Sequence, residues 1–135
     1  MTQLNFEKAI FYDSGKLGIT VDVTIQLSNL SVIFEAKIDT GAEACIFARS
    51  LGEQIGLEIE NGERQRFDTV TGSFVTFGHS VNLNVTDIEF DSYVFFAEDE
   101  NFSRNVLGRF GWLNRVIIGI NDYDGKLYLS RYESE

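Results

Sequence analysis

The chain has 135 residues, of which 44% are hydrophobic and 13% aromatic, with twelve glycines and no proline. That length suits a single domain with a sizeable core, and the apolar content excludes a disordered chain. The formal net charge of -10 would repel nucleic-acid phosphates and anionic lipid. We therefore expect neither nucleic acid nor a membrane as a partner.

The start of the chain and its single cysteine bear on the cellular compartment. Residues 1–7 have neither the basic nor the apolar segment of a signal peptide. No apolar run approaches the roughly 20 residues needed to cross a bilayer. The lone Cys45 rules out an intrachain disulfide, which is compatible with a reducing compartment. We therefore expect a cytoplasmic protein.

Alternating apolar and polar residues predict a hairpin in the first third of the chain. From Leu17 to Leu27 the odd positions are apolar, which indicates a strand with one buried face. Ser28-Asn29 is a turn signal, and a second alternating run extends from Val32 to Ile38. The second strand leads directly into Asp39-Thr40-Gly41-Ala42.

The rest of the chain is predicted to be mostly strand. A short helix is expected near Leu51–Ile55, because Ser50 and Glu53 have the capping-box spacing and Gly56 can end the helix. A hairpin is expected at 67–77 with Gly72 near its tip, and a single helical turn at 110–115. Further strands are expected at 81–85, 93–97, 116–120 and 126–132. The predicted fold class is all-β with one or two short helices.

Asp39 is the most informative residue for function. On its own, Asp-Thr-Gly is common by chance, and a turn aspartate that hydrogen-bonds its own backbone would explain it. Its surroundings favour a site instead: a preceding apolar strand, the segment Ala44–Phe47, the glycine-tipped hairpin, and the late element Val106-Leu107-Gly108-Arg109.

This ordered set resembles the retropepsin-like aspartic proteases, the single-lobe, retroviral-type relatives of pepsin. The resemblance covers roughly residues 17–129. It implies the acid protease fold, a closed β-barrel, in a single domain of residues 1–135 with its core at about 17–129. The chain is longer than a minimal viral protease, which suggests the stand-alone bacterial or Ddi1-like branch.

The resemblance also implies a reaction, the hydrolysis of peptide bonds in a peptide or protein substrate. The chemistry needs two facing carboxylates, and this chain has one Asp-Thr-Gly element. The second carboxylate must therefore come from another copy, most simply in a two-fold homodimer. Two carboxylates about 3 Å apart share one proton, so that one can act as base and the other as acid. No metal and no cofactor are needed.

The neighbours of Asp39 have roles that the resemblance implies. Thr40 would hydrogen-bond across the dimer and hold the two loops rigid. Gly41 would let the backbone approach the substrate, and Ala42 would leave room beside it. Arg109 would pair with Glu43.

Two further segments would complete the site. The hairpin tip would be a flap that closes over the peptide, and the late apolar element would form a psi-loop against the catalytic loop. The flap residues are Val70, Thr71, Gly72, Ser73 and Phe74, and the psi-loop residues are Val106, Leu107 and Gly108.

Other interpretations stay open at this point. The chain could be a binding or dimerisation module that kept the fold without catalysis. It could also be an unrelated β-barrel for a small ligand, with Asp39 in an ordinary turn. Cys45 is expected to be a small buried residue and His79 a surface turn residue, and the sequence has no cluster with metal-ligand spacing.

Overall fold

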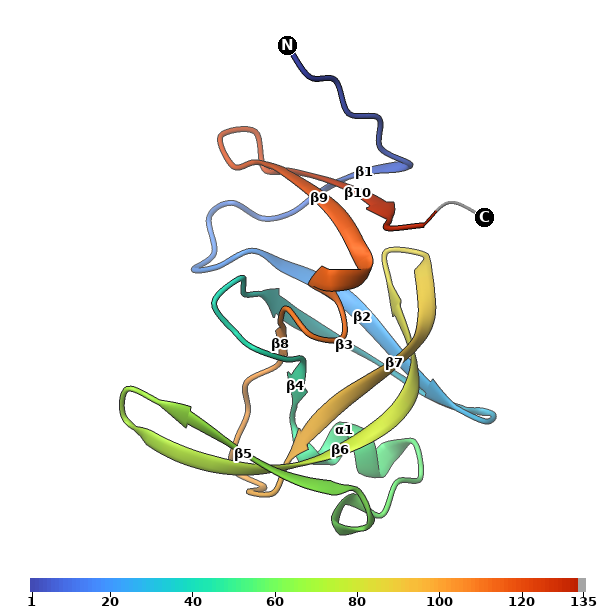
Figure 1. The fold of residues 1–135 in the computed structure, drawn as a ribbon, viewed down its shortest axis with the longest axis vertical. Coiled ribbons are helices and arrows are strands. Elements are labelled where there is room, and N and C mark those ends of the chain that lie inside the picture. The colour runs from blue at the N-terminus through green and yellow to red at the C-terminus, as the bar shows by residue number, and fades with distance from the viewer. Residues whose placement is uncertain (134–135) are drawn as a thin grey trace.

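The computed structural model describes residues 1–133, and within them the chain is mostly strand (Figure 1). The strands are β1 (Lys8–Phe11), β2 (Thr20–Leu27), β3 (Leu30–Ile38), β4 (Ile46–Phe47), β5 (Glu63–Thr69), β6 (Gly72–Val85), β7 (Ile88–Ala97), β8 (Val106–Leu107), β9 (Val116–Asn121) and β10 (Lys126–Arg131). The helical elements are α1 (Arg49–Gln54) and the 3-10 turns η1 (Ile59–Asn61) and η2 (Leu113–Arg115). The predicted all-β class is confirmed.

The hairpin β2–β3 forms where the alternating pattern predicts it. Leu27 pairs with Leu30 across the Ser28-Asn29 turn, where Ser28 has a φ of 55°. The predicted start of the first strand is wrong. Gly18, with a φ of +94°, turns the chain before Thr20, and Leu17 remains outside the strand with its side chain fully exposed.

The strand pairings run in a circuit that β8 completes. β2 pairs with β3, and β3 pairs in parallel with β8, which pairs with β4; the order continues through β7 and β6 back to β2. β8 is only two residues long, yet it lies between β3 and β4, which are close neighbours in the sequence. The loop that joins β3 to β4 must therefore pass over the end of β8.

A long hairpin extends from this circuit. β5 pairs with β6 from Glu63↔Gly78 to Thr69↔Gly72, and the hairpin projects to the left of the body in Figure 1. The predicted hairpin arm and the predicted strand at 81–85 are one continuous strand of 14 residues, β6. Its outer part pairs with β5, whereas its inner part pairs with β7 and β2.

A second, three-stranded sheet has the order β1-β10-β9 and lies at the top of Figure 1. The strands β9 and β10 agree with the prediction, but β1 does not appear among the predicted strands. Its residues Lys8–Phe11 show too short an alternation to stand out, and pairing with β10 decides their conformation.

The helix α1 differs from its prediction at one end. It begins at Arg49, after an N-cap at Ala48 that makes no side-chain capping bond, so the predicted Ser50–Glu53 capping box is wrong. Glu53 instead pairs with Arg49 one turn earlier. The predicted stop is confirmed, because Gly56 has a φ of +90° and its amide donates to the Glu53 carbonyl.

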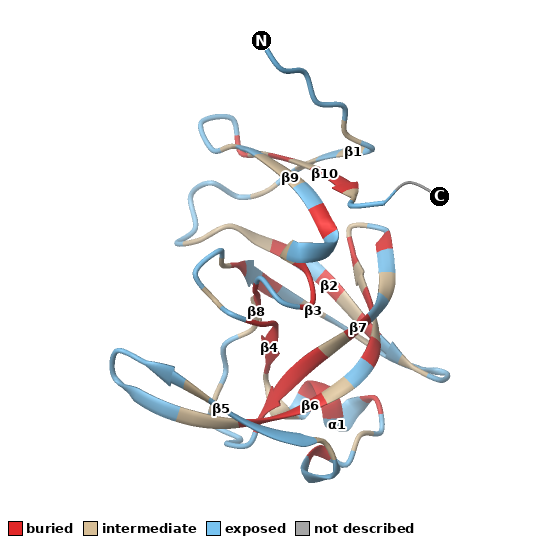
Figure 2. Cartoon of the chain, viewed as in Figure 1, coloured by how far each residue is buried: buried red, intermediate tan, exposed pale blue. Residues whose placement is uncertain are grey.

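The main core lies between the strands of the circuit and under the small sheet (Figure 2). Trp112 is 0% exposed and belongs to this core. The predicted surface turn for His79 is wrong: it is half-buried on β6, its Nε2 lies 2.8 Å from the Ile59 carbonyl oxygen, and its ring meets Phe96. Within residues 1–133, no helix has the length and apolarity required to span a bilayer.

Leu107 supplies a test of the inserted strand. Its side chain is 0% exposed at the middle of the circuit, so Leu107→Ala removes buried apolar atoms where β3, β8 and β4 meet. We expect a loss of about 2–5 kcal/mol in the free energy of unfolding, measured by urea denaturation. The matched control is Leu17→Ala at a fully exposed position, which should change stability by less than about 0.5 kcal/mol. Equal effects of the two substitutions would contradict this account of the core.

Candidate active site

Asp39 lies immediately after β3, in the loop that crosses the end of β8. Its backbone amide donates to the Leu107 carbonyl at 3.0 Å, and its own carbonyl accepts from the Ala42 amide at 3.1 Å. Its carboxylate oxygen Oδ1 accepts from the Gly41 amide at 2.9 Å. This last contact is the one expected of an ordinary turn aspartate. It fixes the side chain on the loop and leaves the carboxylate half-exposed.

The loop after β3 is fastened to the segment after β8 by backbone hydrogen bonds. The Arg109 amide donates to the Ala42 carbonyl at 2.9 Å, and the Phe110 amide donates to the Glu43 carbonyl at 2.8 Å. Gly108 lies so close to this loop that a Cβ atom there would come 2.2 Å from the Ala44 carbonyl oxygen. Only glycine allows this approach of two backbones.

The predicted ion pair between Glu43 and Arg109 is not formed. Within residues 1–133, neither side chain makes a salt bridge or a hydrogen bond, and both are exposed. Backbone hydrogen bonds connect the two segments instead. The loops are therefore held together without a charged pair.

A groove with a volume of about 690 Å³ opens in front of Asp39. The loop after β3 forms its floor, the β5–β6 hairpin forms one wall, and the segment leading into β8 forms the other. The lining residues are Asp39, Gly41, Ala42, Glu43, Ile46, Phe67, Asp68, Thr69, Val70, Thr71, Gly72, Ser73, Phe74, Phe102, Arg104 and Val106. The groove thus brings together the predicted catalytic residue and all five predicted flap residues.

Four of the predicted site residues do not line the groove. Leu107 and Gly108 are buried beneath the loop, where they position Asp39 from behind. Thr40 is exposed, and its hydroxyl has no hydrogen-bond partner within residues 1–133. Arg109 is also exposed beside the loop.

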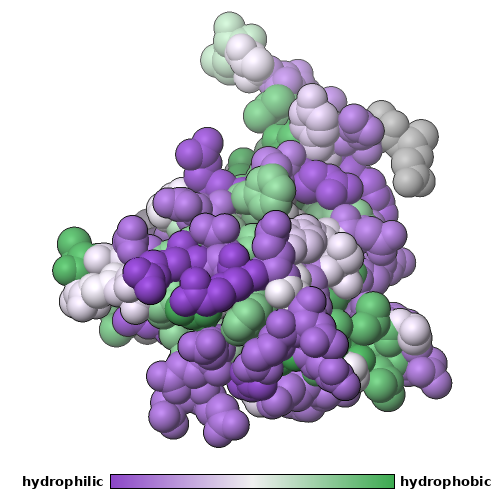
Figure 3. All heavy atoms as spheres, turned by 60° about the horizontal axis from the view of Figure 1, so that its bottom comes forward, coloured by the Kyte–Doolittle hydropathy of each residue, from purple (hydrophilic) through white to green (hydrophobic). Residues whose placement is uncertain are grey.

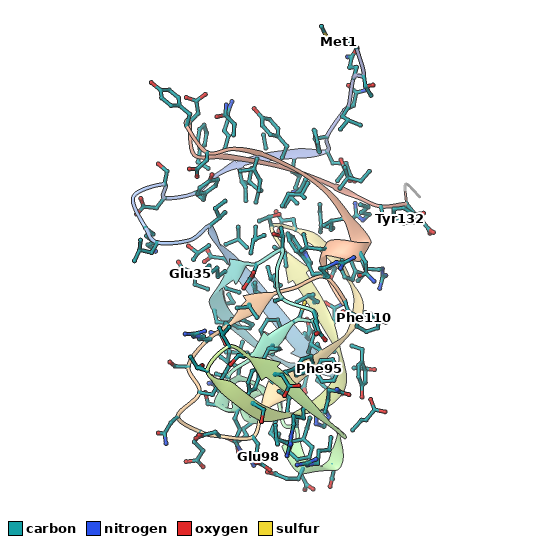
Figure 4. All side chains as sticks on the ribbon, turned by 60° about the vertical axis from the view of Figure 1, so that its left-hand side comes forward. Met1, Glu35, Phe95, Glu98, Phe110 and Tyr132 are labelled. Carbon is teal, nitrogen blue, oxygen red and sulfur yellow. The ribbon has the colours of Figure 1, made fainter. Side chains whose placement is uncertain are left out.

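The hairpin is held beside the groove by aromatic packing. We call the rings of Phe67, Phe74, Phe95 and Phe102 the aromatic shelf. Phe67 meets Phe95 at 5.3 Å between ring centroids, and Phe74 stacks on Phe102 at 4.9 Å. With Ala44 and Ile46 these rings belong to an apolar cluster separate from the main core. Figure 4 places Phe95 beside the hairpin.

The tip of the hairpin, by contrast, has few contacts. Val70 is fully exposed, and a Cβ atom at Gly72 would meet nothing within 4 Å. Figure 3 shows apolar atoms at this left-hand extremity of an otherwise largely hydrophilic face. A tip without packing partners can move at small cost, whereas the aromatic shelf fixes the base of the hairpin.

The sequence-based prediction missed six residues of the groove, namely Ile46, Phe67, Asp68, Thr69, Phe102 and Arg104. Asp68 and Thr69 extend the predicted hairpin tip along β5. Arg104 and Phe102 lie two and four residues before Val106, which the prediction had already placed at the site. The irregular segment 98–105 gave no other signal.

Cys45 is excluded as a groove nucleophile. It is buried behind the loop, and burial raises the pKa of its thiol to about 12, although a backbone hydrogen bond from Gly108 acts in the opposite direction. The thiol is therefore neutral near pH 7, and the packing role predicted for it is confirmed. In the described part of the chain, no group of three or more His, Cys, Asp or Glu residues is arranged to hold a metal ion.

The close approach at Gly108 leads to a test of how Asp39 is positioned. Gly108→Ala would force a methyl group against the Ala44 carbonyl, and we expect a loss of about 3 kcal/mol in unfolding free energy. Gly15→Ala is the control, because the nearest atom there belongs to the flexible side chain of Asp13. A Gly108→Ala variant as stable as the control would show that the two backbones are not in tight contact.

Comparison with known proteins bears on the fold. No protein-family model matches this chain, and no curated protein sequence matches it. Among solved structures, the chain is similar to EIAV protease complexed with the inhibitor HBY-793, with a TM-score of 0.50 and 19% sequence identity. The match covers 80% of this chain and 88% of that one. At this identity the likeness shows the fold alone. The bacterial or Ddi1-like branch stays a prediction, and the retropepsin-like fold is confirmed.

Proposed function

We propose that the protein is an aspartic endopeptidase that acts as a homodimer, with Asp39 from each chain forming the catalytic pair. The observation that carries the proposal is the groove itself. A carboxylate lies at its floor, at the end of a strand, and a hairpin with a loosely packed tip runs along its wall. The retropepsin-like fold supports the same assignment.

The second carboxylate has to come from a second copy of the chain. Asp39 is half-exposed, and the adjacent Thr40 hydroxyl is unpartnered in residues 1–133. Both groups are therefore available to a facing loop. A two-fold axis through the loops would pair Asp39 with Asp39 of the other chain and would let the two Thr40 residues hydrogen-bond across the interface.

The proposed reaction uses the two carboxylates as one base and one acid. Two carboxylates at close range cannot both be ionised, so one carries a proton, and the apparent pKa values belong to the pair. The ionised carboxylate takes a proton from water, whose oxygen bonds to the scissile carbonyl carbon. The protonated carboxyl gives its proton to the carbonyl oxygen. The resulting diol then collapses: the ionised carboxylate takes a proton from a diol hydroxyl, the other carboxyl gives the proton it took from water to the leaving nitrogen, and the C–N bond breaks.

The hairpin would close over an extended peptide. Backbone groups of an extended substrate can pair with the strands of the hairpin and with the floor at Gly41 and Ala42. Closure of the loosely packed tip, Val70 to Ser73, would exclude water from the pair of carboxylates.

Substitution of Asp39 tests the catalytic assignment. Asp39→Asn should lower the rate of peptide cleavage by at least about a thousandfold, because the amide can neither accept nor deliver the proton. Cleavage is measured with an unbiased peptide library between about pH 4 and pH 8, with a statine-type inhibitor as a check. The folded content is followed by circular dichroism.

Asp13→Asn is the matched control for this experiment. Asp13 makes the same local contact as Asp39, accepting the Gly15 amide at 2.9 Å, but it lies outside the groove. Its substitution should leave cleavage unchanged. Wild-type cleavage by the Asp39→Asn variant would refute the assignment. A wild-type protein that cleaves nothing at high concentration would favour a non-catalytic binding or dimerisation module.

Subunit mixing tests whether two chains share one site. Wild-type protein is incubated with a roughly tenfold excess of Asp39→Asn and assayed after exchange. Mixed dimers would hold a single carboxylate, so activity per wild-type chain should fall to roughly one-tenth. The same excess of Asp13→Asn should not reduce it. Undiminished activity in the first mixture, with exchange verified by mass spectrometry of tagged chains, would contradict the shared site.

A further inference from the structure

Arg104 stands apart from the other residues that line the groove. Of these residues, all within 1–133, it has the only basic side chain, whereas Asp39, Glu43 and Asp68 are acidic. It belongs to the segment that leads into β8, on the wall opposite the hairpin. A single cation in an otherwise acidic groove requires a physical explanation.

The backbone on both sides of Arg104 is fixed. Phe102 stacks on Phe74 of the hairpin at 4.9 Å, two residues before it. Asn105, the next residue, accepts the Lys37 amide at its carbonyl and the Ala48 amide at its side-chain Oδ1, both at 2.9 Å. Arg104 is therefore held between two anchors.

Arg104 and Val106 both line this wall of the groove. Leu107 is in the main core, whereas Val106 lines the groove. The Asn105 side chain, between Arg104 and Val106, does not line the groove and accepts the Ala48 amide instead.

The guanidinium of Arg104 has no anionic partner within the described chain. Arg49, by contrast, has two anionic partners, because it makes ion pairs with both Glu60 and Glu53. Arg104 is exposed and makes no salt bridge or side-chain hydrogen bond in residues 1–133. Its five donors are thus available to a ligand in the groove, in a planar arrangement that suits a carboxylate.

The distance from Arg104 to the floor of the groove limits where such a ligand group would lie. The backbone amide of Asp39 donates a hydrogen bond to the carbonyl of Leu107, which lies three residues after Arg104. Three residues of chain span at most about 10 Å, and an extended peptide in the groove rises by about the same amount over three of its own residues. The group that meets Arg104 is therefore within about three residues of the peptide bond nearest Asp39.

We propose that Arg104 is a specificity-determining residue that selects peptides with an acidic side chain, Asp or Glu, within about three residues of the scissile bond. This rests on the proposed peptidase function. The acidic groups Glu43 and Asp68 repel a carboxylate elsewhere in the groove, so the preference is confined to the position that faces Arg104. Closure of the hairpin would strengthen the contact by excluding water.

The test measures binding and cleavage separately. Matched peptides carry Glu, Gln or Lys at one position at a time, over three residues on each side of an otherwise constant cleaved sequence. Binding is measured by calorimetry with Asp39→Asn protein, which does not depend on turnover, and kcat/KM is measured with the wild type. At one position we expect the Glu peptide to bind about tenfold more tightly than the Gln peptide, a difference of about 1.4 kcal/mol in binding free energy, and kcat/KM to favour Glu in the same direction.

Variants of Arg104 then assign the preference to this side chain. Arg104→Gln should abolish the preference for Glu, and Arg104→Glu should replace it with a preference for Lys. Arg64→Gln is the control, because Arg64 is exposed on β5 but does not line the groove. The Arg64→Gln variant should keep the preference for Glu. In the wild type, this preference should weaken as the salt concentration rises, because salt screens the attraction between Arg104 and the carboxylate.

The outcomes separate this inference from the proposed function. Absence of cleavage by the wild type, with the Glu preference retained in binding, would overturn the peptidase and leave the role of Arg104 intact. Cleavage with equal use of Glu, Gln and Lys peptides would overturn the role of Arg104 alone. The role of Arg104 would also be overturned if the Arg104→Gln variant kept the preference for Glu, or if none of the peptides bound.

Discussion

The insertion of β8 between β3 and β4 is the constraint on which the candidate site depends. Because β8 pairs with both neighbours, the chain that connects them must cross its end, and Asp39 lies on that crossing. The crossing is tight enough that Gly108 has no room for a side chain. The position of the carboxylate is thus fixed by backbone hydrogen bonds and steric exclusion, and no charged pair is needed.

The floor of the groove is rigid, whereas the packing of its hairpin wall decreases from the base to the tip. The floor is tied to β8, and the base of the hairpin is held by the aromatic shelf in an apolar cluster of its own. Packing is lost toward the tip, where Val70 and Gly72 face open space. Such a gradient would suit the proposed function, in which the hairpin admits an extended peptide and then covers it.

The electrostatics of the chain act against self-association but do not prevent it. Two copies with a net charge of -10 each repel at long range, and physiological salt screens that repulsion beyond about 8 Å. Contact would therefore depend on local groups. In the proposed dimer, the loop at Asp39 would contribute a carboxylate that can share a proton and a hydroxyl that can donate a hydrogen bond, and these local contacts would offset the long-range repulsion.

Local patterns in the sequence predict the elements that depend on neighbouring residues. Period-two alternation predicted β2 and β3, the Ser28-Asn29 and Gly56 signals predicted a turn and a helix end, and the strand into Asp39-Thr40-Gly41-Ala42 located the candidate carboxylate. The other features depend on contacts between segments that are far apart in the chain. β1 forms because β10 is there to pair with it, and Phe102 and Arg104 reach the groove because β8 carries their segment alongside β3. The absence of a Glu43–Arg109 ion pair also depends on such distant contacts. Backbone hydrogen bonds between the two segments already connect the two loops. Pairings between segments far apart in the chain leave no periodic trace in either one, so local patterns cannot reveal them.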